Sequence, residues 1–237
     1  MRRAPVQLGT ASLVAAALAL APPARAAVPS AEKVRKAVAA TNLAGKRTQP
    51  LVIEVAVLSE NGEVAATGQG KLDPAGGGRI DLTLPDGRTE THERTLSGYR
   101  VTRGGSPADH APELLPPVQL LQAPSAEALA AALLGLGADA ERVDLGVEGS
   151  SDCWVLGGRD PGPFEANGRP SLWIDIESRQ AVRVDEAGGT HFRLGPLAQQ
   201  SGVRFPAWIE TQSAGGLRTR MEIRHVAPAS AAPARSP

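Results

Sequence analysis

Apolar and polar residues alternate with a period of two along much of the chain, most regularly between Leu172 and Val226. This part contains the stretches LWIDIE, VRVD, VRFPAWIE and LRTRMEI. A period of two places successive side chains on opposite faces of a pleated strand. The breaks between these stretches contain Ser178 to Gln180, Gly188-Gly189, Ser201-Gly202 and Gly215-Gly216. Breaks this short predict an antiparallel meander with one apolar and one charged face, because parallel neighbours need long crossovers.

The same alternation predicts further strands in the first two thirds of the chain. We expect them at Leu51–Leu58, Glu63–Leu72, Ile80–Leu84, Arg88–Thr95, Gly98–Arg103, Arg142–Gly149 and Asp152–Gly158. Asn61-Gly62 and Asp86-Gly87 are strong signals for tight hairpin turns. Gly68 and Gly70 weaken their strand, but they also allow it to bend or a neighbour to approach closely.

Three segments have the features of helices instead. Ser30 and Ser125 are good N-caps for helices at Ala31–Leu43 and Ala126–Leu136, and a short apolar helix fits Pro112–Leu121. The two later helices carry many leucines and almost no charge, so they must cover an apolar surface. They are either fixed core or a lid that shifts when a lipid enters. The proline-rich breaks that separate them from the strands favour the lid.

This order of elements is one helix, about five strands, two helices and about six strands. It predicts a mainly β (α+β) fold in which a strongly curved antiparallel sheet is covered by about three short helices. The strings LWIDIE, VRVD, GVRFPAWIE and GGLRTRMEI also resemble the C-terminal half of outer-membrane lipoprotein-sorting proteins, relatives of the periplasmic carrier LolA in the LolA/LolB-like superfamily. The resemblance covers roughly Trp154 to Val226, and the first half is similar only in its order of elements.

The resemblance implies a LolA-like unclosed β-barrel whose apolar hollow, beneath the helices, holds the acyl chains of a lipid or lipoprotein. Aromatic residues make up only 3% of the chain, so the hollow is expected to be aliphatic. We expect Leu129 and Leu133 to form its roof, and Phe205 to lie near the centre of its lower wall. The wall is expected to share the concave face of one sheet and comprises Ile53, Val55, Ile80, Leu82, Leu172, Ile174, Val203, Phe205, Ile209 and Ile223.

Residues 1–26 have the three parts of a cleaved signal peptide. Arg2 and Arg3 form the basic start, residues 8–21 are apolar, and Ala24-Arg25-Ala26 provides small residues for cleavage. The apolar run is short for a membrane-spanning helix, so a retained anchor is the weaker interpretation. We expect residues 27–226 to form one LolA-like domain in the periplasm, and the Ala-, Pro- and Ser-rich residues 227–237 to form a disordered tail.

Residues with reactive or metal-ligating side chains form no recognisable catalytic motif in the sequence. Cys153 is the only cysteine, so an internal disulfide is impossible, and its apolar neighbours predict a small buried hydrophobe. The four histidines lack metal-ligand spacing. Asp175, Glu177, Arg183 and Asp185 are expected on a solvated face, as cross-strand charge pairs rather than as an acid–base pair. We therefore expect no enzyme activity, no metal and no cofactor.

Three classes of function are compatible with these patterns. The first is a monomeric periplasmic carrier or binder of lipid or lipoprotein acyl chains, which the resemblance favours. The second is a periplasmic regulatory sensor that binds a protein partner in the inner or outer membrane. The third is an envelope structural protein without a ligand. The formal net charge is zero, so nothing indicates a nucleic acid as a partner.

Overall fold

The computed structural model describes residues 28–42, 50–108, 111–158 and 169–229. The helices in these residues are α1 (Ala31–Asn42), α2 (Val118–Leu121) and α3 (Ala126–Gly135). The strands before α2 are β1 (Leu51–Leu58), β2 (Val64–Asp73), β3 (Gly77–Thr83), β4 (Thr89–Thr95), β5 (Gly98–Arg103) and β6 (Ser106–Pro107). The strands after α3 are β7 (Asp139–Glu148), β8 (Ser151–Gly157), β9 (Ser171–Asp175), β10 (Ala181–Asp185), β11 (His191–Leu194), β12 (Leu197–Gln200), β13 (Val203–Pro206), β14 (Trp208–Gln212) and β15 (Arg218–Pro228).

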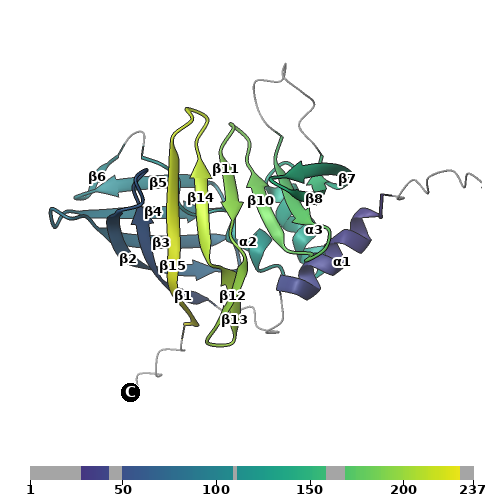
Figure 1. The fold of residues 1–237 in the computed structure, drawn as a ribbon, viewed down its shortest axis with the longest axis horizontal. Coiled ribbons are helices and arrows are strands. Elements are labelled where there is room, and N and C mark those ends of the chain that lie inside the picture. Colours follow the sequence, from purple (N-terminus) through teal and green to yellow (C-terminus); the bar gives the residue numbers. More distant parts are fainter. Residues whose placement is uncertain (1–27, 43–49, 109–110, 159–168, 230–237) are drawn as a thin grey trace, which may run out of the picture.

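Thirteen of these strands form one antiparallel sheet, in the order β6-β5-β4-β3-β2-β1-β15-β14-β11-β10-β9-β8-β7. The first and last strands lie side by side in its middle, where β1 pairs with β15 (Figure 1). β6 and β7 form the two edges and do not pair with each other, so the sheet stays open. The described residues thus confirm the predicted fold class: mainly β, with a curved, unclosed antiparallel sheet and three short helices.

Two glycines in β2 let the first half of the sheet curve tightly. A Cβ atom added to Gly68 would lie 2.1 Å from the carbonyl oxygen of Asp81 on β3. One added to Gly70 would lie 2.8 Å from the carbonyl oxygen of Arg79. Because real Cβ atoms do not come this close to other atoms, β2 can approach β3 here only without side chains. The predicted close approach at both glycines is confirmed.

The VRFPAWIE stretch is not the single strand that its alternation predicts. β13 ends at Pro206 and pairs with β12 in a separate two-stranded sheet, whereas β14 belongs to the main sheet. Between them the Ala207 N–H donates to the carbonyl oxygen of Pro196 at 2.9 Å, and Pro206 has no N–H to continue a ladder. Val203 and Phe205 therefore lie outside the main sheet. The expectation that all ten wall residues share one sheet is wrong for these two.

Other elements also differ from the sequence prediction, among them the short strands β6 and β12, which the sequence does not predict. Most of the helix expected at Pro112–Leu121 is not helical, and only α2 remains, because residues that precede Pro116 and Pro117 disfavour helical backbone. β11 is a further strand that the alternation does not predict. It contains two apolar residues, Phe192 and Leu194, which are too few to establish a period of two.

The last strand extends beyond the domain boundary that the sequence suggests. β15 continues to Pro228, which lies opposite Leu51 on β1, so the strand runs two residues past Val226. The disordered tail expected from residue 227 therefore cannot begin before the end of this strand. Residues 230–237 and the expected signal peptide at 1–26 lie outside the described residues.

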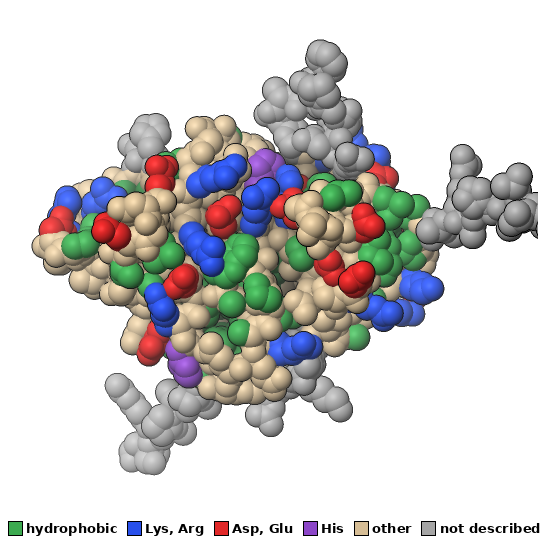
Figure 2. Space-filling view, viewed as in Figure 1, with side chains coloured by type: hydrophobic (Ala, Val, Ile, Leu, Met, Phe, Trp, Pro, Cys, Tyr) green, Lys and Arg blue, Asp and Glu red, His purple; other side chains and the backbone are tan. Residues whose placement is uncertain are grey.

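The helices pack against the concave side of the sheet in two places. α1 contacts α3 and β7, and α2 contacts α3, β2 and β3. The Ser125 hydroxyl accepts a hydrogen bond from the Ala128 N–H at 3.2 Å, which confirms the predicted cap of α3. The face of the sheet seen in Figure 2 carries Lys, Arg, Asp and Glu side chains over its middle strands. The sheet therefore has the apolar and the charged face that the alternation predicts.

Candidate functional site

The wall and roof residues expected from the sequence meet in one hydrophobic cluster. Leu129 and Leu133 on α3 are fully buried in it. Phe205, from the β12–β13 hairpin, is buried in the same cluster, and Val203 is partly buried against it. The wall residues on the main sheet are also buried there, and they are Ile53, Val55, Ile80, Leu82, Leu172, Ile174, Ile209 and Ile223. That these residues hold a ligand stays a prediction.

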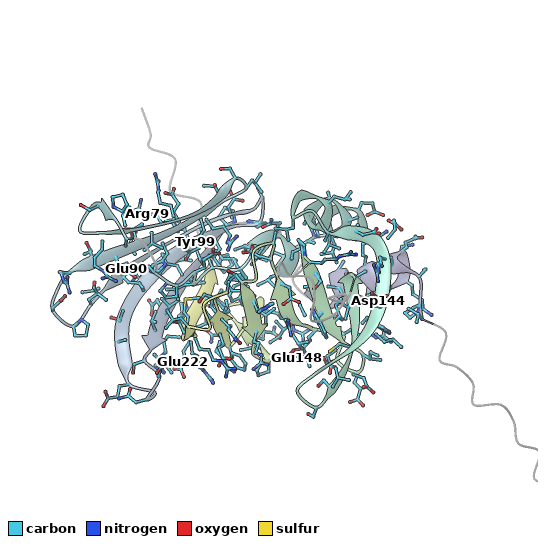
Figure 3. The ribbon with its side chains drawn as sticks, turned by 90° about the horizontal axis from the view of Figure 1, so that it is seen from above. Arg79, Glu90, Tyr99, Asp144, Glu148 and Glu222 are labelled. Carbon is cyan, nitrogen blue, oxygen red and sulfur yellow. The ribbon has the colours of Figure 1, made fainter. Side chains whose placement is uncertain are left out.

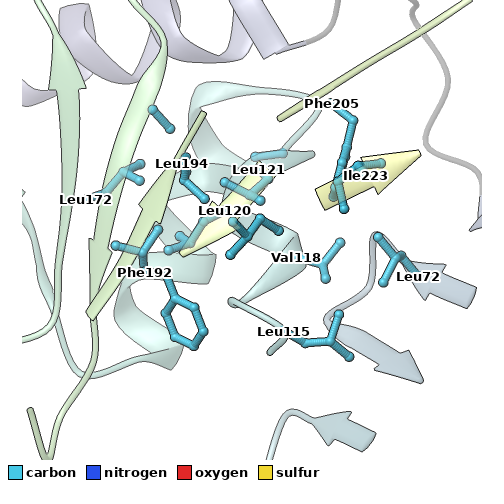
Figure 4. Close-up of a cluster of buried hydrophobic side chains, with 14 of the residues drawn as sticks. Leu72, Leu115, Val118, Leu120, Leu121, Leu172, Phe192, Leu194, Phe205 and Ile223 are labelled. Atoms are coloured by element: carbon cyan, nitrogen blue, oxygen red, sulfur yellow. The ribbon is translucent and has the colours of Figure 1, made fainter. Parts of the chain in front are cut away.

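Residues 111–121, which we call the α2 segment, occupy the middle of this cluster. They lie between Leu72 of β2 on one side and Leu172 of β9 on the other (Figure 4). Besides Pro116 and Pro117, the buried side chains of the segment are Leu114, Leu115, Val118, Leu120 and Leu121. The concave face is therefore covered by aliphatic side chains of the protein itself.

Strand β4 sends three polar side chains into this otherwise apolar interior. Glu90, His92 and Arg94 are all 8% exposed or less, although the sequence pattern alone assigns them no role. The hairpin register places His92 opposite Ile80 on β3, and residues directly opposite each other share a face of the sheet. The Asp86-Gly87 turn, which sets this register, is the signal in the sequence that could have located them.

A chain of hydrogen bonds joins β4, through β5, to the backbone of the α2 segment. His92 Nε2 lies 2.7 Å from Glu90 Oε1, and His92 Nδ1 lies 2.9 Å from the hydroxyl of Tyr99 on β5. Figure 3 labels Glu90 and Tyr99, which lie in the same part of the molecule. The Tyr99 hydroxyl also accepts from the Leu114 N–H at 2.8 Å. Burial lowers the pKa of His92 and raises the pKa of Tyr99. A neutral imidazole that accepts from Tyr99 and donates to Glu90 fits these contacts.

Arg94 makes the second connection to the α2 segment. Its Nε donates to the carbonyl oxygen of Leu115 at 2.5 Å, and its Nη2 donates to Glu113 at 2.6 Å. Nη1 and Nη2 also donate to the two carboxylate oxygens of Glu186, at 2.8 and 3.1 Å. The guanidinium carbon lies 5.0 Å from the ring centre of Tyr99, which adds a cation–π contact. Arg94 and Tyr99 therefore tie the α2 segment to the sheet.

Two carboxyl groups share the single positive charge of Arg94. The side chain of Glu186, in the turn after β10, is 12% exposed, and that of Glu113 is 31% exposed. Burial, together with the nearby Glu113 carboxylate, raises the pKa of Glu186 to about 7, although Arg94 opposes this rise. A proton on one of the two carboxyl groups removes the repulsion between them. This site therefore changes its charge near neutral pH.

The outer face of the sheet carries a second charged network. The Asp185 carboxylate accepts from the Trp173 indole N–H at 2.8 Å and from Arg183 Nε at 2.6 Å, and it lies 2.7 Å from His191 Nδ1. Burial raises the pKa of Asp185, but hydrogen bonds from His191 and Arg183 outweigh it and lower the pKa overall. The expectation of a solvated residue is wrong for Asp185, because these partners enclose it. Ser171 donates to Asp185 rather than to His191, so a histidine-activated serine is not formed.

The remaining candidate groups are the cysteine and the metal ligands. Cys153 is buried, as predicted, and burial raises the pKa of its thiol to about 11. Among the described residues, no group of three or more His, Cys, Asp or Glu could hold a metal ion. Within the same part of the chain, no helix is both long and apolar enough to cross a membrane.

Comparisons with solved structures relate this fold to a group of proteins. An outer membrane lipoprotein-sorting protein domain from Vibrio parahaemolyticus is 9% identical, with a TM-score of 0.46, and the match covers 86% of this chain and 95% of that one. A DUF1329 family protein from Desulfovibrio piger is 11% identical, with a TM-score of 0.48 and coverage of 86% and 95%. A LolA superfamily protein from Nitrosomonas europaea is 11% identical, with a TM-score of 0.42 and coverage of 86% and 96%.

The sequence by itself matches no protein-family profile and no curated protein. At identities of 9 to 11%, the structural likeness concerns the fold and not the activity. The chain is similar in structure to an outer membrane lipoprotein-sorting protein domain, a DUF1329 family protein and a LolA superfamily protein, each with a TM-score below 0.5.

Proposed function

We propose that this protein is a non-enzymatic periplasmic carrier or binder of lipid or lipoprotein acyl chains. The observation that supports the proposal is a separable segment of leucines, the α2 segment, that covers an aliphatic concave face. In this proposal an acyl chain takes the place of these leucines between α3 and the sheet. The class of ligand comes from the resemblance of the Leu172–Val226 stretch to lipoprotein-sorting proteins.

Replacement of the α2 leucines by an acyl chain exchanges one apolar group for another, which supports reversible binding of the ligand. When the α2 segment moves outward, its side chains lose burial, and each methylene of an incoming chain regains roughly 0.8 kcal/mol. The bonds from Arg94 and Tyr99 are then lost. Hydrogen bonds that involve a charged group are worth about 1.5 to 3 kcal/mol each. The balance between these contributions decides whether the protein is closed or loaded.

The attachment of the α2 segment favours its movement over that of any strand. In the described residues it takes no part in the hydrogen-bond ladder of the sheet. Its residues before α2 have no regular structure, and Pro116 and Pro117 cannot donate backbone hydrogen bonds. Its polar ties come from the two side chains Arg94 and Tyr99, so few bonds break when it leaves.

The variant Leu133→Asn tests this proposal, and Leu134→Asn is its matched control. Both leucines lie on α3, but Leu133 is fully buried and Leu134 is 64% exposed. An amide at position 133 must be desolvated against aliphatic neighbours, unless the helix tilts outward. We expect Leu133→Asn to weaken binding of a fluorescent fatty-acid probe to delipidated protein, while the far-ultraviolet circular dichroism of the sheet is retained. Leu134→Asn should bind the probe as the wild type does.

The decisive result concerns the wild-type protein. If the delipidated monomer binds neither the fatty-acid probe nor an acylated peptide, the carrier proposal fails. The leucines of α2 and α3 are then ordinary core, and a ligand-free envelope role or a partner-binding role becomes the better account.

A further inference from the structure

One part of the concave face lies open at the end of the sheet where α1, β7 and β8 meet. A groove there has a volume of about 710 Å³, which is within the range of about 300 to 1,000 Å³ of small-molecule sites. Its walls come from the first turn of α1, the β7–β8 hairpin and the turn that follows β9. Figure 2 shows hydrophobic side chains gathered at this end of the molecule.

The floor of the groove is apolar and spans three adjacent strands. Leu145 of β7 lies directly opposite Trp154 of β8, and Ile176 follows the end of β9. Leu145 is 45% exposed and its neighbour on the same face, Val147, is 62% exposed. Trp154 also packs against the main hydrophobic cluster, so the groove continues the apolar face that the helices cover elsewhere. A contiguous apolar surface of this kind marks a binding site more often than a scattered apolar residue does.

The charged side chains of the groove favour an anion. Lys33 on α1 and Arg179 in the turn after β9 line it, together with a single carboxylate, Asp152. Neither the Lys33 nor the Arg179 side chain forms an ion pair with another of the described residues. The groove therefore combines an apolar floor with an excess of one positive charge. This combination is complementary to an apolar chain that ends in a negative group.

We propose that this groove binds a long-chain fatty acid, with the acyl chain on the apolar floor and the carboxylate near Lys33 and Arg179. The proposal rests on the proposed function for its ligand class, but it places the ligand on the closed protein, with the α2 segment still in position. An extended peptide is the other conceivable occupant, because β7 is an edge strand. The apolar residues lie across the face of three strands and not along that edge, so a peptide paired with β7 would leave Trp154 and Ile176 uncovered.

The apolar floor is tested with Leu145→Asp and the control Leu217→Asp. Both leucines are 45% exposed, but Leu217 lies outside the groove, so neither substitution removes a core side chain. The probe is a pyrene-labelled hexadecanoic acid, titrated into delipidated protein. We expect Leu145→Asp to raise the Kd roughly tenfold or more, because one buried leucine contact is lost and a carboxylate faces the chain. Leu217→Asp should bind as the wild type does.

The anion preference is tested with the matching pyrene-labelled hexadecanol, which lacks the carboxylate. The wild type should bind the acid more tightly than the alcohol. Combining Lys33→Gln with Arg179→Gln should weaken binding of the acid by roughly three- to tenfold, as expected for exposed charge pairs, and leave binding of the alcohol unchanged. The control combines Lys71→Gln with Arg218→Gln, which removes the same two charge types outside the groove.

The outcomes separate this inference from the proposed function. If Leu145→Asp and Leu217→Asp bind the probe equally well, the groove is not the binding site. If the wild type binds the acid and the alcohol with equal affinity, the groove does not recognise the carboxylate. If Leu133→Asn loses the probe while Leu145→Asp keeps it, the acyl chain takes the place of the α2 leucines between α3 and the sheet, and the proposed function stands without the groove. If the wild type binds neither probe, both proposals fail.

Discussion

The proton shared near Arg94 leads to a prediction about the pH dependence of stability. Glu186 has a pKa of about 7 in the folded protein, against an ordinary value of 4.5. At pH values between 4.5 and 7, Glu186 keeps its proton in the folded protein, whereas the unfolded chain has released it. The contribution of Glu186 to stability is therefore fully present below pH 4.5, falls as the pH rises towards 7 and is constant above it.

The size of the effect follows from the shift. One pKa unit corresponds to about 1.4 kcal/mol, so the step from pH 5.5 to pH 7 should lower the free energy of unfolding by about 2 kcal/mol. Glu186→Gln keeps the shape and a hydrogen-bond donor but has no proton to release. We expect this variant to lose that part of the pH dependence, and to be less affected than the wild type by the rise from pH 5.5 to 8.

Urea unfolding followed by circular dichroism at pH 5.5, 7 and 8 measures these free energies by linear extrapolation. Glu93→Gln is the control, because Glu93 lies on the same strand as Arg94 but pairs with Arg100 on the outer face. It should show the wild-type pH dependence. Glu113→Gln should reduce this part of the pH dependence without removing it, because burial still raises the pKa of Glu186 when the neighbouring carboxylate is gone.

Other groups near Arg94 do not mimic this result. The pKa of His92 is lowered in the folded protein, so its contribution to stability is lost as the pH falls, which is the opposite slope. The contribution of His92 is the same in the wild type and in all three variants, so it cancels when the pH dependence of a variant is compared with that of the wild type. If Glu186→Gln and the wild type have parallel pH dependences between 5.5 and 8, the assignment of the shared proton to this pair is refuted.

Two further predictions concern the fold and the export of the chain. Gly68→Ala should be severely destabilised or fail to fold, since its Cβ would lie 2.1 Å from the Asp81 carbonyl oxygen. Gly135→Ala, at the end of α3 with open space and no positive φ, should cost far less, and thermal unfolding would show the difference. Amino-terminal sequencing of the exported protein should begin near Ala27, and recovery of the full-length chain in the membrane fraction would contradict a cleaved signal peptide.

The sequence by itself determined most of the strands and most of the buried positions. A period of two reports which residues share a face, and turn signals such as Asn61-Gly62 mark where a strand ends. β1 and β5 have the bounds that these patterns predict, and the cap at Ser125 begins α3. Leu129 and Leu133 meet the sheet because their helix has too little charge to stand in water.

Only the tertiary structure decided what the buried polar residues contact. The TETHERT stretch of β4 is polar on both faces, so only its register with β3 across the Asp86-Gly87 turn indicates which face is buried. Arg94 reaches Glu113, 19 residues away, and Glu186, 92 residues away, only because the sheet curves and brings β10 near the α2 segment. Likewise, Pro206 interrupts the hydrogen-bond ladder at the junction of β13 and β14. That β13 pairs with β12 depends on the path of the whole chain. Local patterns carry no information about contacts at such separations, since these are set by register and curvature.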